Sequence, residues 1–204
     1  MRIEVVVFDG FDDLDAFGPY EVLRHAARRV EGWDVALVGA HGPAALRTAH
    51  GVRVQVEQGL GERDPDGIVV AGGGWHDAGP GARAEAERGD LPRRLAELAP
   101  RCRWTASVCT GALLLAAAGL TTGRPAVTHH SALDDLRATG ADVRDEARVV
   151  DDGDLITAAG ITSGLDLALH LVEREADLHT ADAVAHHLAY HRQPITRTRG
   201  PAAR

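Results

Sequence analysis

Short apolar strands alternate with helical segments along most of this chain, and this alternation constrains the fold more than any other feature. Residues 3–8 are β-branched and almost wholly apolar, as expected for a strand buried on both faces, and residues 14–30 follow with apolar side chains at helical spacing. We place the start of that helix at Gly18-Pro19. The same two patterns of apolar residues predict strands at 34–39, 67–71, 103–108 and 125–127, and helices at 111–120, 163–173 and 180–187.

Repeated strand-then-helix units predict a doubly wound α/β fold, in which a mostly parallel sheet carries helices on both faces. Residues 149–158 differ, because two β-rich segments flank Asp152-Gly153, the usual turn of a small β-hairpin. No repeat or long linker divides the chain, so we expect a single domain over residues 1–192. Residues 193–204 carry few apolar side chains and are expected to form a mobile tail.

Composition narrows the classes of function. A chain of 204 residues with 45% hydrophobic residues can bury a substantial core, and a net charge of −8 argues against non-specific nucleic-acid binding. The sequence has no apolar run long enough to span a membrane and no export signal at its start, so we expect a cytoplasmic protein without a membrane partner. All 22 basic residues are arginine, which excludes Schiff-base chemistry on lysine.

Cys109 lies where a buried strand runs directly into an Ala- and Leu-rich helix. Such a junction resembles a nucleophile elbow, which lifts a side chain above the carboxyl edge of the sheet and needs a small neighbour, here Gly111. The helix N-terminus would favour the thiolate. Position alone leaves a second interpretation, in which Cys109 is a small buried hydrophobe. Cys102, at the start of the same strand, is interpreted as structural or incidental, and both cysteines as reduced thiols.

Two loops at the expected carboxyl edge carry candidate partners for this cysteine. Gly72-Gly73-Gly74 follows a buried strand and would let backbone amides approach a ligand, although a glycine run alone is weak evidence. The loop after the first strand holds Asp12, Asp13 and Asp15, and a carboxyl group beside the apolar residues there would have a raised pKa. For Asp12 and Asp13 a solvated loop or a helix cap is the favoured interpretation.

The eleven histidines do not form a convincing metal motif. His187 and His191 are four residues apart and would share a helix face, but no carboxylate or cysteine stands at ligand spacing. His129 is treated separately, because it follows a short strand after the nucleophile helix and could reach the same crevice. We therefore expect no metal site.

The order of these motifs resembles that of the ThiJ/PfpI superfamily, and within it the isonitrile hydratase branch. The resemblance spans about residues 1–191 and rests on the acidic loop before Gly18-Pro19, Gly72-Gly73, Ser107-Val108-Cys109-Thr110-Gly111, residues 117–129 and residues 159–164. It implies a flavodoxin-like fold and a homodimer. It also implies a reactive cysteine paired with an acid from the first loop, which fall on Cys109 and Asp15.

By the same resemblance, the amides that stabilise a developing anion fall on Gly73 and Thr110. The pocket-lining positions fall on Gly72, Gly74, His129, Ile161 and Thr162. The chain departs from the protease branch, which carries His directly after the cysteine, and from the hydratase pattern at Ala71 and His130, where that pattern resembles Pro and Trp. These departures leave the substrate open.

The resulting hypothesis is a cofactor-free hydratase or lyase acting on a small electrophile. The favoured substrate is an isonitrile, which would become an N-substituted formamide through a covalent thioimidate on Cys109, with Asp15 moving the protons. A glyoxalase- or deglycase-like thiol enzyme is one alternative. The other is a sensor without turnover, in which Cys109 is oxidised as the signal.

Overall fold

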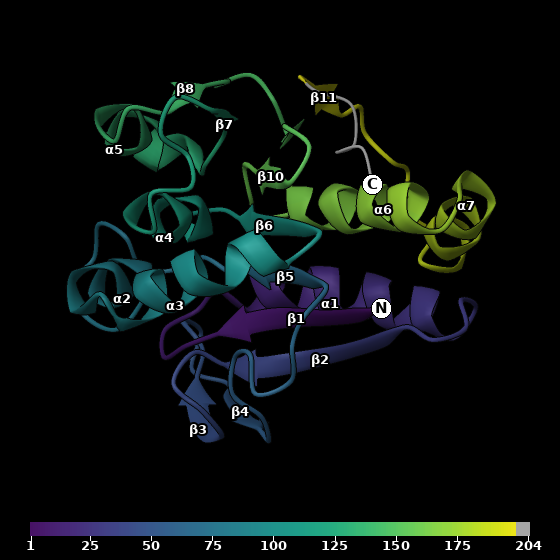
Figure 1. The fold of residues 1–204 in the computed structure, drawn as a ribbon, viewed down its shortest axis with the longest axis horizontal. Helices are drawn as coiled ribbons and strands as arrows, with labels where there is room; N and C mark the ends of the chain where they lie inside the picture. The colour runs from purple at the N-terminus through teal and green to yellow at the C-terminus, as the bar shows by residue number, and fades with distance from the viewer. Residues whose placement is uncertain (199–204) are drawn as a thin grey trace.

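The computed structural model describes residues 1–198, and its strands and helices alternate along the chain (Figure 1). The elements are β1 (Arg2–Val7), α1 (Asp13–Ala27), β2 (Asp34–Gly39), β3 (Ala44–Arg47), β4 (Arg53–Val56), β5 (Gly67–Val70), α2 (Ala82–Arg88), α3 (Asp90–Leu98), η1 (Ala99–Arg101), β6 (Trp104–Val108), α4 (Gly111–Ala117), β7 (Pro125–Ala126), η2 (His130–Ala132), α5 (Leu133–Ala138), β8 (Asp142–Val143), β9 (Val149–Asp151), β10 (Leu155–Ala158), α6 (Ser163–Glu175), α7 (Leu178–His187) and β11 (Thr196–Arg197).

The described residues form a seven-stranded central sheet with the order β11-β9-β10-β6-β5-β1-β2. The strands from β10 to β2 are all parallel to their neighbours, and in chain order they run 2-1-3-4-5, the order of flavodoxin-like sheets. β9 is antiparallel to β10, so the predicted hairpin across Asp152-Gly153 is confirmed. The predicted doubly wound, mostly parallel sheet is likewise confirmed.

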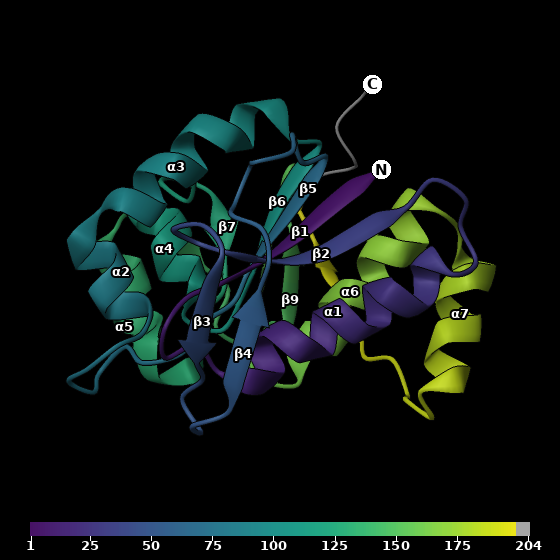
Figure 2. The same cartoon turned by 90° about the horizontal axis from the view of Figure 1, so that it is seen from below.

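Helices cover both faces of this sheet because its central strands have no solvent-facing side. Every residue of β1, β5 and β6 is buried. Helices α1, α6 and α7 pack together on one face, and α2, α3 and α4 pack together on the other (Figure 2). Burial on both faces explains why these strands read as continuous apolar runs rather than as alternating patterns.

Helix α1 begins five residues earlier than the sequence predicts. Asp12 is its N-cap, with its Oδ1 accepting a hydrogen bond of 3.1 Å from the amide of Leu14, and Pro19 lies inside the helix. Proline is compatible with helical φ but cannot donate to the carbonyl of Asp15, four residues earlier. The acidic cap therefore marks the helix start, and Gly18-Pro19 does not. This shift places Asp15 in the first turn of a helix rather than in a loop.

Several elements have no counterpart in the sequence prediction. The β3–β4 hairpin forms its own small sheet and docks on the loop after β1, where the Arg47 amide donates to Asp9 Oδ1 at 2.8 Å and the Ala49 amide to the Phe11 carbonyl at 2.9 Å. The segment expected to be a mobile tail contributes β11, which pairs with β9, and residues 199–204 lie outside the described residues. Over the described chain, no helix has the length and apolar character needed to cross a membrane.

Candidate functional site

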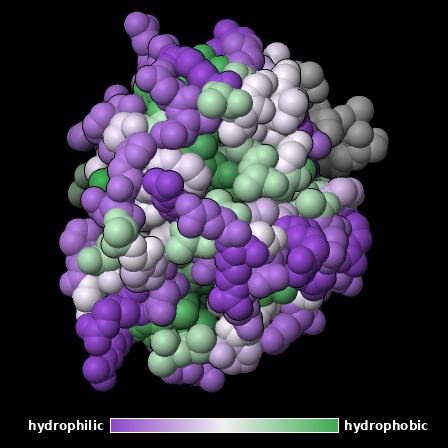
Figure 3. Space-filling model, turned by 90° about the vertical axis from the view of Figure 1, so that its left-hand side faces the viewer, coloured by the Kyte–Doolittle hydropathy of each residue, from purple (hydrophilic) through white to green (hydrophobic). Residues whose placement is uncertain are grey.

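Four loops meet at the carboxyl edge of the sheet, following β1, β5, β6 and β10. In open α/β sheets ligands bind at this edge, where the strand order reverses, and here the reversal lies between β1 and β5. The face of the molecule at this end shows apolar atoms in hollows between hydrophilic side chains (Figure 3). The loops after β1, β5 and β6 carry Asp15, the glycine run and Cys109.

Cys109 has the backbone conformation of a nucleophile elbow. Its φ of 58° lies in the left-handed region, which is uncommon for a non-glycine residue and is held here by its neighbours. The Cys109 amide donates to the Ala158 carbonyl at 2.9 Å, and its carbonyl accepts from Thr128 Oγ1 at 2.9 Å. A Cβ on Gly111 would lie 2.4 Å from the Val70 carbonyl oxygen, so the predicted need for glycine beside the cysteine is met.

Bare glycine backbone lies against Cys109 on one side and against its neighbours Thr110 and Asp15 on another. A Cβ on Gly160 would lie 2.5 Å from the Cys109 Cβ and 3.1 Å from its Sγ. A Cβ on Gly72 would lie 2.6 Å from the Thr110 amide nitrogen and 2.9 Å from Asp15 Oδ2. No other residue type fits these two positions without displacing the site. The two glycines therefore explain how loops from distant parts of the sequence close around one thiol, which is only 7% exposed.

Asp15 is fully buried in the first turn of α1, against Gly72. Burial raises the pKa of its carboxyl group to about 8, and the negative charge of Asp12 adds to the shift. The nearby Cys109 thiol and Gly72 amide oppose the shift without cancelling it, and neither oxygen of Asp15 has a hydrogen-bond partner among the described residues. At neutral pH the Asp15 carboxyl group is therefore mostly protonated, as the sequence analysis expects for an acid held beside apolar residues.

The thiol of Cys109 differs from the sequence expectation. Burial raises its pKa well above the ordinary value, and the neighbouring Asp15 raises it further, while a hydrogen bond from the Thr110 amide acts in the opposite direction. Helix α4, which begins after this residue, has only seven residues. Desolvation outweighs the favourable field of the helix N-terminus, so Cys109 and Asp15 form a pair of neutral acids at rest rather than a thiolate beside a carboxyl group.

Thr110 has a role that the sequence did not reveal. The Gly73 amide, expected to face a developing anion, donates a hydrogen bond of 2.9 Å to Thr110 Oγ1. The carbonyls of Gly73 and Gly74 accept from the amides of Ala82 and Arg83 at the start of α2, at 2.7 and 3.1 Å. The glycine run thus anchors α2, and its Gly73 amide is held by the hydroxyl of Thr110. Because that hydroxyl can both accept and donate, it can take part in binding a ligand in place of the amide.

Three further predicted pocket residues lie around this centre. His129 caps η2, with its Nδ1 2.8 Å from Ser131 Oγ, and its half-buried ring stacks on His130 at a centroid distance of 4.0 Å. Burial and His130 lower the pKa of His129, while Asp12 opposes the shift.

Ile161 is 38% exposed, directly after Gly160. Thr162 caps α6, and its hydroxyl accepts from Arg148 at 3.2 Å.

Asp12 is the charged residue of the site, and the sequence analysis assigned it no role there. Besides capping α1, its carboxylate raises the pKa of Asp15, Cys109 and His129. The cap pattern ahead of Leu14 in the sequence is the one signal that could have placed it, since a cap side chain is fixed relative to the first helical turn. Asp13 instead points to the β3–β4 hairpin, where its Oδ2 lies 2.7 Å from His50 Nδ1.

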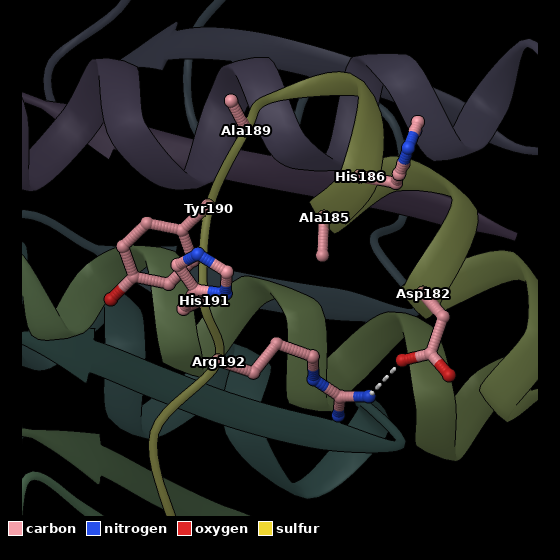
Figure 4. A pocket seen from close by; sticks show the side chains of 7 residues that line it. All are labelled: Asp182, Ala185, His186, Ala189, Tyr190, His191 and Arg192. Carbon is pink, nitrogen blue, oxygen red and sulfur yellow. Dashed lines mark hydrogen bonds and ion pairs between the residues drawn. The ribbon is translucent and has the colours of Figure 1, made fainter.

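The histidines near the C-terminus do not join this site. Helix α7 ends at His187, so His191 does not share its face as the sequence predicts, and His187 instead contacts His25 at a ring distance of 4.4 Å. A surface pocket of about 590 Å³ lies between the last turns of α7 and residues 189–192, and the rings of His186 and His191 lie apart in it (Figure 4). Within residues 1–198 no group of three or more His, Cys, Asp or Glu side chains is arranged to hold a metal ion.

Comparison with known proteins agrees with this architecture. The model of the DJ-1/PfpI family matches residues 1–174. The chain is 34% identical over 192 residues to the isonitrile hydratase of Pseudomonas putida, covering 93% of this chain and 78% of that protein. It is 30% identical over 165 residues to a deglycase of Pyrococcus abyssi, covering 78% of this chain and 89% of that protein.

Among solved structures, a ThiJ/PfpI family protein from Pseudomonas syringae superposes with a TM-score of 0.83 at 29% identity, covering 95% of this chain and 76% of that chain. The family match extends over most of the chain, and its first 174 residues include the loops that carry Asp15, Gly72, Cys109 and Gly160. The chain belongs to the DJ-1/PfpI family.

Proposed function

We propose that this protein hydrates an isonitrile to an N-substituted formamide, with Cys109 as the nucleophile and Asp15 as the proton carrier. The observation that carries this proposal is the buried pair itself, a thiol and a carboxyl group that are both neutral at rest because burial raises both pKa values. The similarity to the isonitrile hydratase of Pseudomonas putida supports the same substrate class.

A neutral pair suits the addition of S–H across the terminal carbon of an isonitrile. The sulfur of Cys109 forms a bond to that carbon while one oxygen of Asp15 accepts the thiol proton. The other oxygen of Asp15 gives its own proton to the same carbon. The product is a thioimidate, S–CH=N–R, and Asp15 ends the step neutral, as it began. No charge is left in a site where burial would penalise it.

Hydrolysis of the thioimidate completes the cycle. Water adds to the thioimidate carbon, with its second proton passing to the nitrogen, and gives S–CH(OH)–NH–R. The carbon–sulfur bond then breaks, the hydroxyl proton returns to sulfur, and the formamide HC(O)–NH–R leaves. Atoms balance as isonitrile plus water to formamide. Since nucleophile, proton carrier and water account for every bond, we propose a reaction that needs no metal or organic cofactor.

Thr110 and Gly73 are the proposed donors to the charge that develops during water addition. The Thr110 amide already lowers the pKa of the Cys109 thiol, and the Thr110 hydroxyl accepts a hydrogen bond from the Gly73 amide. A shift of that hydroxyl toward the bound substrate would release the amide at the same moment, so both donors would become available together.

The test is direct incubation of the purified protein with cyclohexyl isonitrile, following formamide by chromatography. Turnover by the wild type that is lost in Cys109→Ser and kept in Cys102→Ser supports the proposal. Wild-type protein that forms no formamide from any simple alkyl isonitrile overturns it.

A second candidate is attack of the same thiol on an aldehyde, as in a glyoxalase or deglycase. The specific observation in its favour is the similarity to the Pyrococcus abyssi deglycase. Methylglyoxal consumption that depends on Cys109, without isonitrile turnover, would favour this candidate. Oxidation of Cys109 by dilute peroxide, without turnover of either substrate class, would favour a sensor.

We also propose that the protein is a homodimer, because a face that a single chain leaves partly apolar is commonly covered by a second copy. A surface pocket along α1, lined by Phe17, Tyr20, Glu21, Arg24, His25 and Arg28, is one candidate region. Light scattering at two concentrations tests the stoichiometry, and a strictly monomeric particle would overturn it.

A further inference from the structure

The loop of residues 159–162, which joins β10 to α6, lies directly against Cys109. A Cβ on Gly160 would lie 2.5 Å from the Cys109 Cβ and 3.1 Å from its Sγ, so the loop backbone covers the thiol. The Cys109 amide donates to the carbonyl of Ala158, the residue before the loop, at 2.9 Å. The position of this loop therefore sets how far the Cys109 side chain is exposed.

Arg148, the residue before β9, holds this loop at both ends. Its carbonyl accepts a hydrogen bond of 2.8 Å from the Ala159 amide, and its Nη2 donates to Thr162 Oγ1 at 3.2 Å. The same guanidinium donates to Asp166 Oδ2, from Nε at 3.1 Å and from Nη2 at 2.8 Å. These charge-assisted bonds to Asp166 fix the plane of the guanidinium that reaches the loop.

Asp166 is a buried hub in the first turn of α6. It is 2% exposed, and its oxygens accept hydrogen bonds from two segments outside the helix, one before β9 and one after α7. Besides Arg148, the Tyr190 hydroxyl donates to Oδ2 at 3.0 Å and the Gln193 amide donates to Oδ1 at 2.8 Å. Removing any of these partners leaves a desolvated polar group without its hydrogen bond, so the arrangement resists displacement.

The second of these segments, residues 190–193, leaves the end of α7 and runs alongside α6 (Figure 4). It lies outside residues 1–174, which match the family model. Hydrogen bonds therefore connect a part of the chain beyond the matched region, through Asp166 and Arg148, to the loop that covers Cys109.

We propose that Asp166 is a positioning residue for Cys109. Through Arg148 it holds the loop of residues 159–162 against the thiol, and residues 190–193 fix Asp166 in turn. This role rests on the proposed function only in taking Cys109 as the nucleophile. It goes beyond that function, because it assigns a group that acts through the loop and not on the reacting atoms, whatever electrophile is bound.

The first experiment measures how fast iodoacetamide alkylates each thiol at a fixed pH, with the two cysteine peptides quantified by mass spectrometry. Asp166→Asn keeps the shape but replaces one acceptor oxygen by an amide donor. The Cys109 rate should then rise by about 3–10-fold, because a loosened loop exposes the thiol and weakens the burial that raises its pKa. Cys102 should react at its wild-type rate, since it lies at the other end of β6.

Tyr190→Phe is the milder variant and decides alone if Asp166→Asn does not fold. It removes one hydroxyl donor to Asp166, so the Cys109 rate should rise by about 2–3-fold, again without a change at Cys102. An equal rise at both cysteines would mean that the whole fold is loosened, and would overturn the proposal. A Cys109 rate that is unchanged or lower in both variants would also overturn it.

Asp182→Asn is the matched control. It breaks the exposed ion pair of 3.0 Å that Asp182 makes with Arg192, on the same segment as Tyr190, and leaves the contacts of Asp166 in place. Both thiols should therefore react at their wild-type rates. A Cys109 rate that rises as much as in Asp166→Asn would overturn the assignment to Asp166.

The second experiment measures kcat and KM for cyclohexyl isonitrile. Asp166→Asn should lower kcat by about 10–100-fold with a smaller change in KM, because a misplaced thiol loses its attack geometry. Asp182→Asn should keep kcat within about twofold.

The two experiments separate this proposal from the proposed function. If the wild type hydrates no isonitrile while the alkylation rates of Cys109 change as expected, the proposed function fails and the positioning role stands. If the wild type hydrates isonitriles while neither the alkylation rate nor kcat changes in Asp166→Asn and Tyr190→Phe, the positioning role fails and the proposed function stands.

Discussion

Strand β6 has a cysteine near each end, and the two differ in almost every respect that matters for chemistry. Cys102 lies before the strand, half-buried, with its Sγ 3.4 Å from the Pro65 carbonyl. Cys109 follows the strand at the carboxyl edge, in a left-handed turn, near Asp15 and against the backbone of Gly160. Burial raises the pKa of both thiols, to about 11 for Cys102 and further for Cys109.

The difference teaches that an elevated pKa does not by itself separate an inert thiol from a candidate nucleophile. Cys102 has no carboxyl group positioned to take its proton within residues 1–198, and the acidic groups that act on its pKa, such as Glu4, do so through charge. Cys109 has the buried, protonated carboxyl group of Asp15 close enough to raise the pKa of its thiol. What distinguishes the two ends of β6 is the buried carboxyl group that the loops of the carboxyl edge bring beside one thiol only.

The largest expected effect separates the two thiols directly. Cys109→Ser should lower isonitrile turnover by about 10³-fold or more, because the weaker oxygen nucleophile replaces the thiol in both steps. Cys102→Ser should keep turnover within about twofold. The rate of formamide formation from one isonitrile substrate measures turnover in both variants. Loss of turnover in Cys102→Ser, with circular dichroism unchanged, would contradict the assignment of chemistry to the carboxyl edge.

The next effect removes the proton carrier while keeping its shape. Asp15→Asn should lower turnover by about 10²–10⁴-fold, the usual contribution of general acid–base catalysis. Asp13→Asn should have little effect, since its carboxylate pairs with His50 at the β3–β4 hairpin. If instead Asp13→Asn lost activity and Asp15→Asn kept it, the wrong carboxyl group would have been assigned.

A smaller effect appears in stability rather than in rate. The pKa of Asp15 rises from 3.8 to about 8 on folding, so between these values the folded state holds a proton that the unfolded chain has released. The free energy of unfolding therefore falls as pH rises through this window, by a few kcal/mol in total. Asp15→Asn lacks this loss, so its stability relative to the wild type should increase from about pH 4 to about pH 8. Urea denaturation across that range, with Asp13→Asn as the control, measures the difference.

The two ends of β6 also show what the sequence could predict. The strand-to-helix junction at Cys109 is a local signal, because the apolar run, the small residue at 111 and the Ala/Leu stretch are contiguous. The alternation of strands and helices predicted a parallel sheet. It did not predict the order of the strands within that sheet. The family resemblance implied a pairing of Asp15 with Cys109, and in the structure each of the two groups shifts the pKa of the other.

What the sequence could not predict depends on contacts between distant segments. The thiol pKa depends on how deeply four loops bury Cys109, and the local argument from the helix N-terminus gave the opposite direction. The hydrogen bond between Gly73 and Thr110 joins the ends of two strands that are neighbours only in the folded sheet. The start of α1 was misplaced because Pro19 is a strong local signal for a helix start. Asp12, which caps the helix, could equally have belonged to a solvated loop on sequence grounds.

The last and smallest effect tests the coupling between Cys109 and Asp15 itself. Asp15 raises the pKa of the Cys109 thiol, chiefly through its charge. Asp15→Asn removes the charge, so the thiol pKa should fall toward its ordinary value even as turnover is lost. The readout is the ultraviolet absorbance of the thiolate as a function of pH, in a Cys102→Ser background that leaves one thiol.

Cys102 supplies the comparison for this titration. In a Cys109→Ser background its thiol should titrate near its own raised value of about 11 whether or not Asp15 is replaced, because Asp15 is not among the groups that act on it. A shift confined to Cys109 would mean that the carboxyl group is coupled to one thiol and not to the other. An unchanged Cys109 titration in Asp15→Asn would mean that burial alone sets its pKa, and the proposed proton exchange between the two groups would lose its physical basis.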